Sequence, residues 1–231
     1  MSQIAYSPPR DCGLDLIYFD ASLLVVSKPA GLLSVPGKGT DKSDSLATRV
    51  RNDFPDALNV HRLDMSTSGL LVFARGVGMH RQLSQLFRER KVNKSYLAMV
   101  AGRLDIASGV VDLPLSADWP NRPRQKVNLA IGKPALTRYR LLPDLNTHSH
   151  RAVHHGEPDL ATSRVELHPV TGRTHQLRVH MAAIGHPILG DMLYGGAAGS
   201  RADRLLLHAR QLSFVHPLGN ETMTFICEAP F

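Results

Sequence analysis

The chain has 231 residues, of which 43% are hydrophobic and 20% charged, and its formal net charge at pH 7 is +7. This length suits one large domain. No stretch approaches the roughly eighteen consecutive apolar residues of a membrane helix, so we expect no association with a membrane. The positive charge favours a polyanionic partner, and the alternative is a basic protein without such a partner.

The two cysteines, Cys12 and Cys227, lie near opposite ends of the chain and form no CxxC motif. They indicate a reducing compartment, in which a structural disulfide is not expected. The N-terminus has no basic segment followed by an apolar core, so we expect no secretory signal and a cytoplasmic location. Residues 1–13, which contain Pro8 and Pro9, are predicted to be a leader.

The first part of the chain predicts strands, a loop and a helix. Apolar residues recur at four-residue spacing from Leu46 to Phe54 and predict a helix that begins near Asp44 or Ser45 and that Pro55 ends. The other elements expected here are strands at 14–19, 23–28 and 69–75 and a Gly- and Pro-rich loop at 28–40.

Two further helices are expected, over 78–90 and from Thr174 to Gly185. The Pro-broken basic segment 118–127 and the polar, His-rich segment 143–161 are predicted to be loops. The remaining strands are expected at 95–102, 110–115, 134–142, 162–168, 205–208, 211–215 and 222–228. Because strands and helices do not alternate regularly, we predict an α+β fold with a mainly antiparallel sheet.

The segment Asn59–Arg75, "NVHRLDMSTSGLLVFAR", places one carboxylate, Asp64, just before an apolar strand. Such an acid is usually a turn former or a cap for nearby amides. If Asp64 is buried, it must instead be paired, hydrogen-bonded or protonated. Its role therefore depends on whether a cation faces it.

The motif "TGRTHQLRVH" offers cations. Arg178 borders the apolar stripe of the predicted helix, so it either meets an anion or extends along its stem to water. Arg173 and His175 fall in the expected first turn, where a cation opposes the helix dipole unless an anion binds as well. Tyr96, which begins a strand, is either simply half-buried or stacks on a nucleobase.

No cofactor or metal site is predicted. The histidines at 148, 150, 154 and 155 are dense, but their spacing in a loop is not a metal signature. The sequence "GKG" at 37–39 lacks the further residues of a dinucleotide or P-loop motif.

Taken together, these motifs resemble those of the RluA family of pseudouridine synthases, over about residues 14–231. "VHRLDMSTSGLLVFAR" is similar to the segment with that family's catalytic aspartate. Four others also resemble family motifs: "VVSKPAGLLSVPG", "NKSYLAMVAG", "VTGRTHQLRVHMAAIGHPILGD" and "RLLLHARQLSF". The resemblance implies a mixed, mostly antiparallel sheet in two halves, flanked by helices and loops, with the active-site cleft between them.

The resemblance also implies roles for individual residues. Asp64 matches the catalytic aspartate, and Tyr96 matches the tyrosine that stacks on the target uracil. Arg178 matches the basic residue paired with the aspartate, and Arg62 an arginine that displaces the target base. The resemblance further implies a single catalytic domain over 14–231, without a separate N-terminal RNA-binding domain. The reaction keeps the base, so no cofactor and no metal are expected.

An RNA partner follows from the same resemblance. "DLPLSADWPNRPRQKV" is similar to the dual-specificity member, which modifies uridines in 23S rRNA and in tRNA anticodon stem-loops. The alternatives are the same chemistry on one of these RNAs, a non-catalytic RNA-binding module, or a glycoside hydrolase, which usually needs two carboxylates. We expect a monomer with no required protein partner. The residues expected to contact RNA are Arg62, Arg122, Arg124, Lys126 and Arg173.

Overall fold

The computed structural model describes residues 6–143 and 161–231. These residues form two compact units, and each is described separately below. Unit 1 comprises the chain up to Lys94 together with Ala209–Pro230, and unit 2 comprises Ser95–His208 together with Phe231. The His-rich segment 146–158, for which the sequence predicted a loop, lies outside the described residues.

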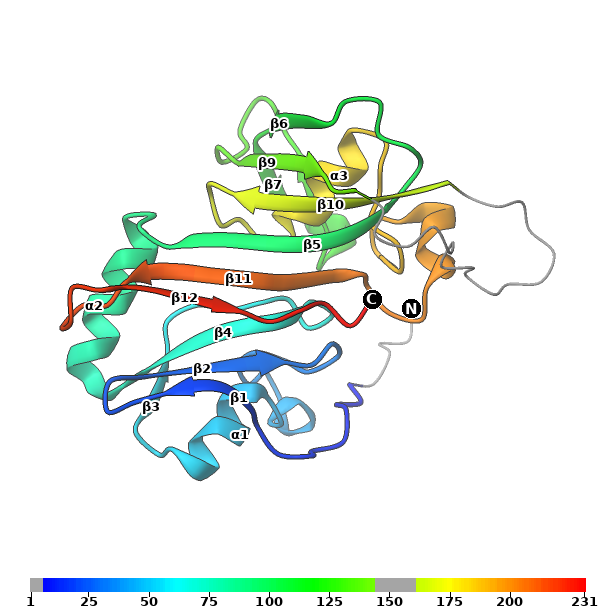
Figure 1. Ribbon diagram of the computed structural model, residues 1–231. Coiled ribbons are helices and arrows are strands. Elements are labelled where there is room, and N and C mark those ends of the chain that lie inside the picture. Colours follow the sequence, from blue (N-terminus) through cyan, green and yellow to red (C-terminus); the bar gives the residue numbers. More distant parts are fainter. Residues whose placement is uncertain (1–5, 144–160) are drawn as a thin grey trace. The chain divides into compact units, whose positions relative to one another are not determined.

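Unit 1 is built around a mostly antiparallel sheet with the strand order β1-β2-β4-β11, in which β3 also pairs with β4 and β12 pairs with β11 (Figure 1). Its strands are β1 Asp15–Phe19, β2 Leu23–Lys28, β3 Ala57–Asn59, β4 Ser68–Arg75, β11 Leu207–Val215 and β12 Thr222–Ile226. Its helices are α1 Leu46–Asp53, α2 Gly76–Arg88 and the short 3₁₀ helix η1 Thr40–Lys42.

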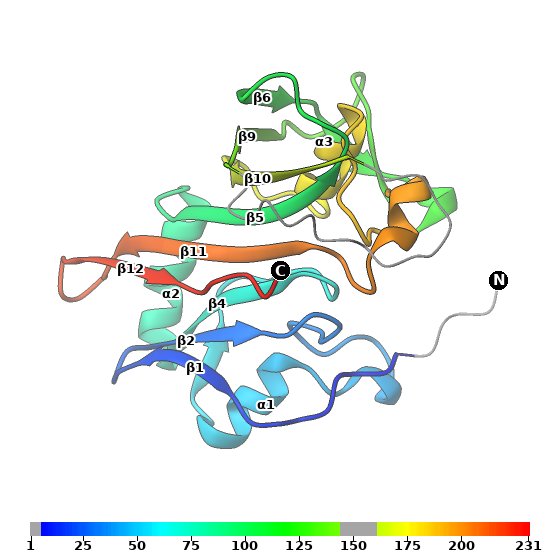
Figure 2. The same ribbon diagram turned by 45° about the vertical axis from the view of Figure 1, so that its right-hand side comes forward.

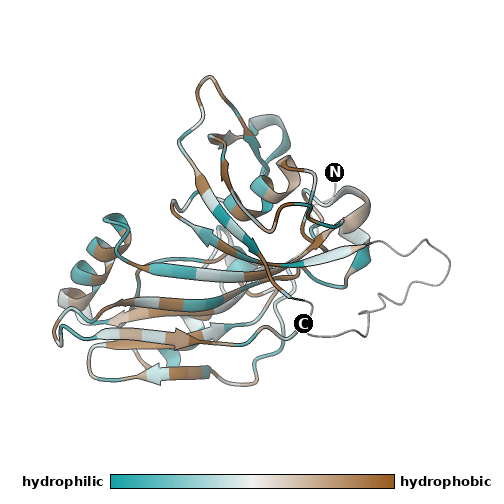
Figure 3. Ribbon diagram, turned by 45° about the horizontal axis from the view of Figure 1, so that its top comes forward, coloured by the Kyte–Doolittle hydropathy of each residue, from teal (hydrophilic) through white to brown (hydrophobic). Residues whose placement is uncertain are grey.

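The core of unit 1 follows from two unbroken apolar runs. Leu23–Val26 of β2 and Leu70–Ala74 of β4 are buried throughout. A strand whose successive side chains are all buried must be covered on both faces. The helix α2 packs its buried Met79 and Leu83 into this core. In Figure 3 hydrophobic (brown) and hydrophilic (teal) residues alternate along this helix.

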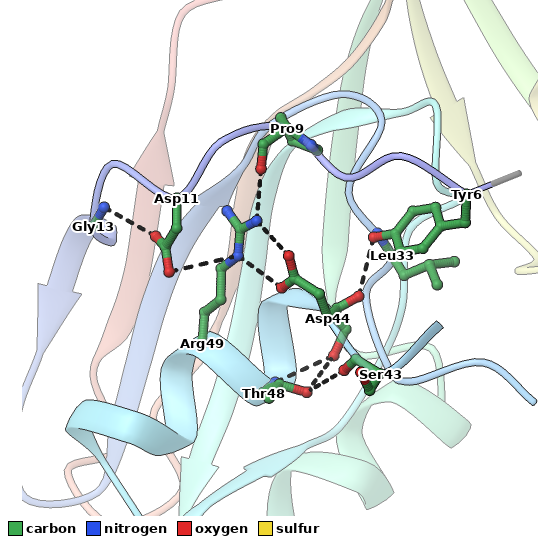
Figure 4. A network of polar contacts seen from close by, with 10 residues as sticks. Tyr6, Pro9, Asp11, Gly13, Leu33, Ser43, Asp44, Thr48 and Arg49 are labelled. Carbon is green, nitrogen blue, oxygen red and sulfur yellow. Dashed lines mark hydrogen bonds and ion pairs between the residues drawn. The ribbon is translucent and has the colours of Figure 1, made fainter. Parts of the chain in front are cut away.

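The described part of the N-terminal segment is tied to α1 by a polar network (Figure 4). The Arg49 guanidinium donates to both carboxylate oxygens of Asp44 and to the carbonyl of Pro9. The Tyr6 hydroxyl accepts a bond from the Leu33 amide and donates to the Asp44 carbonyl. The hydrogen bond from Arg49 lowers the pKa of the Asp44 carboxyl, which keeps this pair charged at neutral pH.

Unit 2 contains an antiparallel sheet in the order β5-β10-β9-β6 and a separate β7-β8 hairpin (Figures 1 and 2). Its strands are β5 Asn93–Ala101, β6 Ser108–Asp112, β7 Leu115–Ala117, β8 Gln125–Val127, β9 Leu136–Leu141 and β10 Thr162–Pro169. Its helices are α3 Gln176–Ala183 and the 3₁₀ helices η2 Trp119–Asn121 and η3 Gly196–Arg201.

The predicted α+β class with mainly antiparallel strands is confirmed. Helix α1 begins at Leu46, next to the predicted start, and Ser45 caps it, since the Ser45 side chain accepts a bond from the Thr48 amide. Helix α3 ends at the predicted glycine: Gly185 has φ 85°, and the Gly185 and His186 amides donate to the Ala182 and Met181 carbonyls. Among the residues described, no helix is long and apolar enough to cross a membrane.

Several predicted boundaries are wrong. The strands expected at 205–208 and 211–215 are one strand, β11, and β3 was missed because it is only three residues long. The segment expected to be a loop at 118–127 ends in β8, which pairs with β7 into a hairpin. The prolines and charges of this segment are typical of the hairpin tip, and they gave no indication of the short strands on either side of the tip. Cys12 is exposed, and the Cys227 thiol donates to the Ser27 hydroxyl.

Candidate active site

The Asp64 side chain is half-buried in the loop that joins β3 to β4 in unit 1. The loop closes on itself, because the Thr67 amide donates to the Asp64 carbonyl at 3.1 Å. Two residues beyond, Gly69 has φ 107°, and any side chain on it would collide with the backbone of Ala209 in β11. The glycine of "STSGLL" therefore allows β4 to begin directly after the aspartate loop.

Lys28, at the end of β2, holds the residue that follows Asp64. Its side chain is fully buried, and its ammonium donates to the carbonyl oxygens of Pro29, Leu32 and Met65 at 2.7–3.0 Å. The Gly31 amide donates to the same Met65 carbonyl. Because a buried ammonium needs compensating acceptors, this lysine clamps the "KPAGL" loop and the aspartate loop together.

The residues preceding Asp64 are held as well. The Ser34 hydroxyl donates to the Leu63 carbonyl at 2.7 Å and accepts from the Leu63 amide. The His61 Nε2 atom accepts a bond from the Val72 amide of β4, and the ring stacks on Phe87 with centroids 4.4 Å apart. Desolvation, with the nearby charge of Lys94, lowers the pKa of His61 to about 3, which keeps the imidazole neutral and able to accept.

The backbone on both sides of Asp64 is thus anchored by unit 1 itself. This arrangement presents one carboxylate at a defined position. Arg62, by contrast, has an exposed side chain, which is compatible with the predicted contact to RNA. The roles of both residues stay predictions at this point.

Tyr96 lies near the start of β5 in unit 2, half-buried against the apolar cluster that contains Leu167, its partner in β10. The neighbouring Ser95 donates to Glu166 at 2.7 Å, and Arg140 donates to the same carboxylate at 2.6 Å. Burial raises the pKa of Glu166, but the hydrogen bonds from Ser95, Arg140 and His168 outweigh this effect and lower the pKa to about 2. A charged carboxylate therefore fixes the strand segment that carries Tyr96.

Arg178 is buried, with 4% of its surface exposed, so of the two alternatives it meets an anion and does not extend to water. The structure shows a carboxylate that the sequence analysis did not identify. Asp191 accepts two bonds from the Arg178 guanidinium, at 2.8 and 2.7 Å, and this fork-shaped pair is the strong form of the interaction. Asp64 belongs to the other unit, and its pairing with Arg178 stays a prediction.

The backbone around Asp191 holds this carboxylate in a fixed position. Gly190 has φ 71°, and a side chain there would collide with the Arg204 carbonyl, so only glycine fits this turn. Asp191 also accepts bonds from the amides of Leu193 and Tyr194. These contacts fix the carboxylate, which in turn fixes the plane of the Arg178 guanidinium.

Tyr194 connects this pair to the β7-β8 hairpin. Its ring lies 5.2 Å from the Arg178 guanidinium carbon, and its hydroxyl accepts a bond from the Gln125 amide of β8 at 2.7 Å. The same hydroxyl lies 2.7 Å from His175 Nδ1. One tyrosine therefore contacts the arginine of the predicted active site and the strand that follows the basic hairpin tip.

The start of α3 was predicted two residues too early. His175 has φ 55°, a left-handed conformation that cannot belong to the helix, and Gln176 is the first helical residue. The Gln176 side chain accepts bonds from the Thr171 hydroxyl and the Arg173 amide, which holds the preceding turn. Arg173 and His175 therefore lie outside the helix, and their predicted place in its first turn was wrong. Its contact with RNA stays a prediction.

The three predicted RNA-binding residues of the hairpin, Arg122, Arg124 and Lys126, are exposed. Lys126 forms a surface ion pair with Asp118 at 3.3 Å. Exposed cations on one short hairpin are suited to phosphate contacts.

Sequence reasoning missed Lys28, Asp191 and Tyr194. The first two lie inside segments that resemble family motifs, "VVSKPAG" and "GHPILGD", and the glycine before Asp191 was a signal of a constrained turn. Nothing in the local pattern indicated Tyr194, because its partners come from two other segments of the chain.

Comparisons with known proteins show the family of the chain. Residues 22–183 match the family described as RNA pseudouridylate synthase. The chain is 48% identical over 227 residues to the dual-specificity RNA pseudouridine synthase RluA of Escherichia coli (strain K12), and the match covers 98% of both chains. The protein of the same name from Haemophilus influenzae is 46% identical over 232 residues, with complete coverage of both chains.

Solved structures show the same relationship. Human RNA Pseudouridylate Synthase Domain Containing 1 has a TM-score of 0.75 and 31% sequence identity, over 97% of this chain and 87% of that one. Human RNA Pseudouridylate Synthase Domain Containing 4 has a TM-score of 0.68 and 26% identity, over 93% of this chain and 88% of that one. The chain therefore belongs to the RNA pseudouridylate synthase family and is an isomerase that converts uridine in RNA to pseudouridine.

Proposed function

We propose that this synthase modifies uridines in 23S rRNA and in the anticodon stem-loop of tRNAs, with Asp64 as the catalytic carboxylate. The dual specificity is supported by the near-complete coverage of relatives named for it. The assignment of Asp64 rests on one observation: the loop that carries it is anchored by backbone bonds on both sides, from Lys28, Ser34 and His61. Such anchoring places one carboxylate at a fixed position, as group positioning in catalysis requires.

In the proposed reaction the bond between N1 and C1′ breaks, the uracil turns, and a bond forms between C5 and C1′. C5 loses its hydrogen as a proton and N1 gains one, so atoms and electrons balance without an external reductant or oxidant. Asp64 acts as the nucleophile or the base. Tyr96 stacks on the uracil and takes up the C5 proton.

The remaining residues assist in this proposal. Arg178, held in plane by Asp191, supplies a fixed positive charge that favours the ionised form of Asp64. Arg62 displaces the target base from its stack, at a cost of a few kcal/mol that stacking on Tyr96 offsets in part. Arg122, Arg124, Lys126 and Arg173 contact phosphates.

The proposal includes a single catalytic domain over 14–231 that acts as a monomer, without a required protein partner, in the cytoplasm. Two cysteines near opposite ends of the chain, without a CxxC motif, are compatible with that reducing compartment. Sedimentation at micromolar concentration, with and without RNA, tests the monomer.

Tritium release from RNA labelled at uridine C5 tests the activity and the role of Asp64 together. The substrates are a 23S rRNA fragment, a tRNA anticodon stem-loop and a blunt duplex as negative control. The wild type should release tritium from the first two. Asp64→Asn should abolish release while it binds both RNAs with unchanged Kd, and the matched control Asp53→Asn, at an exposed position, should behave as the wild type.

Full turnover by purified Asp64→Asn would contradict the catalytic assignment. Release from only one of the two RNAs would contradict the dual specificity. Binding of both RNAs without any release by the wild type would contradict the activity as a whole.

A further inference from the structure

Trp119, the single tryptophan of the chain, is 68% exposed in η2 at the tip of the β7-β8 hairpin. A large aromatic side chain that stays mostly in water buries little apolar surface on folding, which leaves the ring accessible to a ligand. The predicted contacts in the active site do not involve it.

The geometry around the ring is that of a stacking site. The Arg122 guanidinium carbon lies 3.4 Å from the centroid of the Trp119 ring, which places a planar cation on the indole. Since Trp119 is nevertheless 68% exposed, most of the aromatic surface stays open to a further planar group.

The tip that carries Trp119 is held in a defined conformation. Asp118 accepts side-chain bonds from Asn121 and Lys126, and its amide donates to the Arg124 carbonyl at 2.9 Å. The Gln125 amide donates to the Tyr194 hydroxyl, which fastens the hairpin to the body of unit 2. A preformed site loses little conformational entropy when a ligand binds.

We propose that Trp119 and Arg122 form a stacking site for an unpaired nucleobase of the RNA substrate other than the reacting uracil. The inference rests on the proposed function, because it takes RNA as the partner. Every nucleobase has a π face that stacks on an aromatic ring, and Arg122 next to the ring also neutralises a phosphate. The exposed cations Arg124 and Lys126 on the same hairpin make the charge of the site complementary to RNA.

The site selects single-stranded RNA. Bases inside a duplex already stack on their neighbours, whereas unpaired loop bases can leave the stack and lie on an aromatic side chain. Trp119 thus contacts the unpaired bases of an RNA loop, whereas the surrounding cations contact the phosphates of single-stranded and duplex RNA alike.

Intrinsic fluorescence tests the proposal, because tryptophan emission comes from Trp119 alone. The full-length chain is titrated with an RNA stem-loop that has an unpaired loop and with a blunt duplex of the same stem. The stem-loop should quench the emission and the duplex should not. Trp119→Ala should raise the Kd for the stem-loop about tenfold, the loss expected for one stacked base, and leave the Kd for the duplex unchanged.

Matched variants distinguish stacking on an aromatic face from contact with any apolar side chain. Trp119→Phe keeps an aromatic face and should recover most of the affinity, whereas Trp119→Leu is apolar without that face and should behave as Trp119→Ala. In the tritium-release assay Trp119→Ala should raise KM with unchanged kcat. The exposed position makes a folding defect unexpected, and equal melting temperatures of all variants check this.

Wild-type Kd in Trp119→Ala, or unquenched emission from the bound stem-loop, would overturn the proposal. Self-association of the wild type that Trp119→Ala abolishes, with RNA affinity unchanged, would assign the ring to a second copy of the chain instead. Quenching by the stem-loop without tritium release would leave this site standing and contradict the proposed activity.

Discussion

The two units hold their key side chains in opposite ways. In unit 1 the Lys28 ammonium and the Ser34 hydroxyl hold the backbone next to Asp64, and the neutral His61 ring ties the loop to the Val72 amide of β4. In unit 2 the side chain of Arg178 is itself gripped, by the two oxygens of Asp191.

The difference reflects what each group must do. Backbone anchoring sets the position of a carboxylate through the main chain, whereas the Asp191 carboxylate fixes a guanidinium through its own donor groups. The comparison predicts that removing the Asp191 carboxylate causes the larger loss of stability, and that disturbing the lysine clamp of unit 1 lowers turnover as well as stability.

The largest effect is expected from Asp191→Asn, which keeps the shape of the side chain and removes its charge. Arg178 is then buried without this anion, and the free energy of unfolding should fall by about 3–5 kcal/mol. Urea denaturation measures it, with the exposed Asp203→Asn as control. Adding Arg178→Met to Asp191→Asn should restore part of the stability. A loss below about 1 kcal/mol, typical of a surface pair, would refute the structural role of Asp191.

Lys28→Met tests the clamp in unit 1. The substitution keeps the volume but leaves three carbonyl oxygens without this donor, so the free energy of unfolding should fall by about 2–3 kcal/mol. Because the Met65 carbonyl is one of the three, kcat in the tritium-release assay should fall more than KM rises. Lys38→Met, at an exposed position, is the control. Unchanged kcat in folded Lys28→Met would show that the clamp does not position Asp64.

The free energy of unfolding at acidic pH tests whether Glu166, which accepts a bond from Ser95 next to Tyr96, is ionised in the folded chain. Its pKa is lowered from 4.5 to about 2 in the folded chain, so its contribution is present above pH 4.5 and is lost as the pH falls toward 2. We expect this contribution to be about 2 kcal/mol at neutral pH. Glu166→Gln should flatten the pH dependence between pH 5 and 2.5 by about that amount, whereas the exposed Glu221→Gln should not. The same change in the free energy of unfolding between pH 5 and 2.5 for the wild type and Glu166→Gln would contradict the contribution expected from Glu166.

The smallest effect concerns the hairpin of unit 2. Arg124 is expected to contact phosphate without touching the reacting base, so Arg124→Ala should raise Kd modestly and reduce the slope of log Kd against log salt by about 0.7. Filter binding between low and moderate salt measures the slope, and Arg81→Ala on the exposed side of α2 is the control. Equal slopes for Arg124→Ala and the wild type would remove this residue from the RNA contacts.

The sequence predicted most of the local structure correctly. The apolar runs of β2 and β4, the start of α1 near Ser45 and the Gly185 end of α3 depend on neighbours within a few residues, and they are confirmed. The errors lie where partners farther along the chain override the local pattern. The Gln176 side chain holds the turn before α3 and donates to the Leu136 carbonyl 40 residues away. Pairing between β7 and β8 makes strands of residues that look like a loop.

The sequence by itself determined the family, the α+β class and the segment with one aspartate, because motifs and periodicity are local properties. Only the tertiary structure decided which groups satisfy the buried charges. The Lys28 ammonium reaches a carbonyl 37 residues away, and Arg178 meets a carboxylate 13 residues away. Burial makes such partners necessary, but it does not say which acceptor packing will bring near.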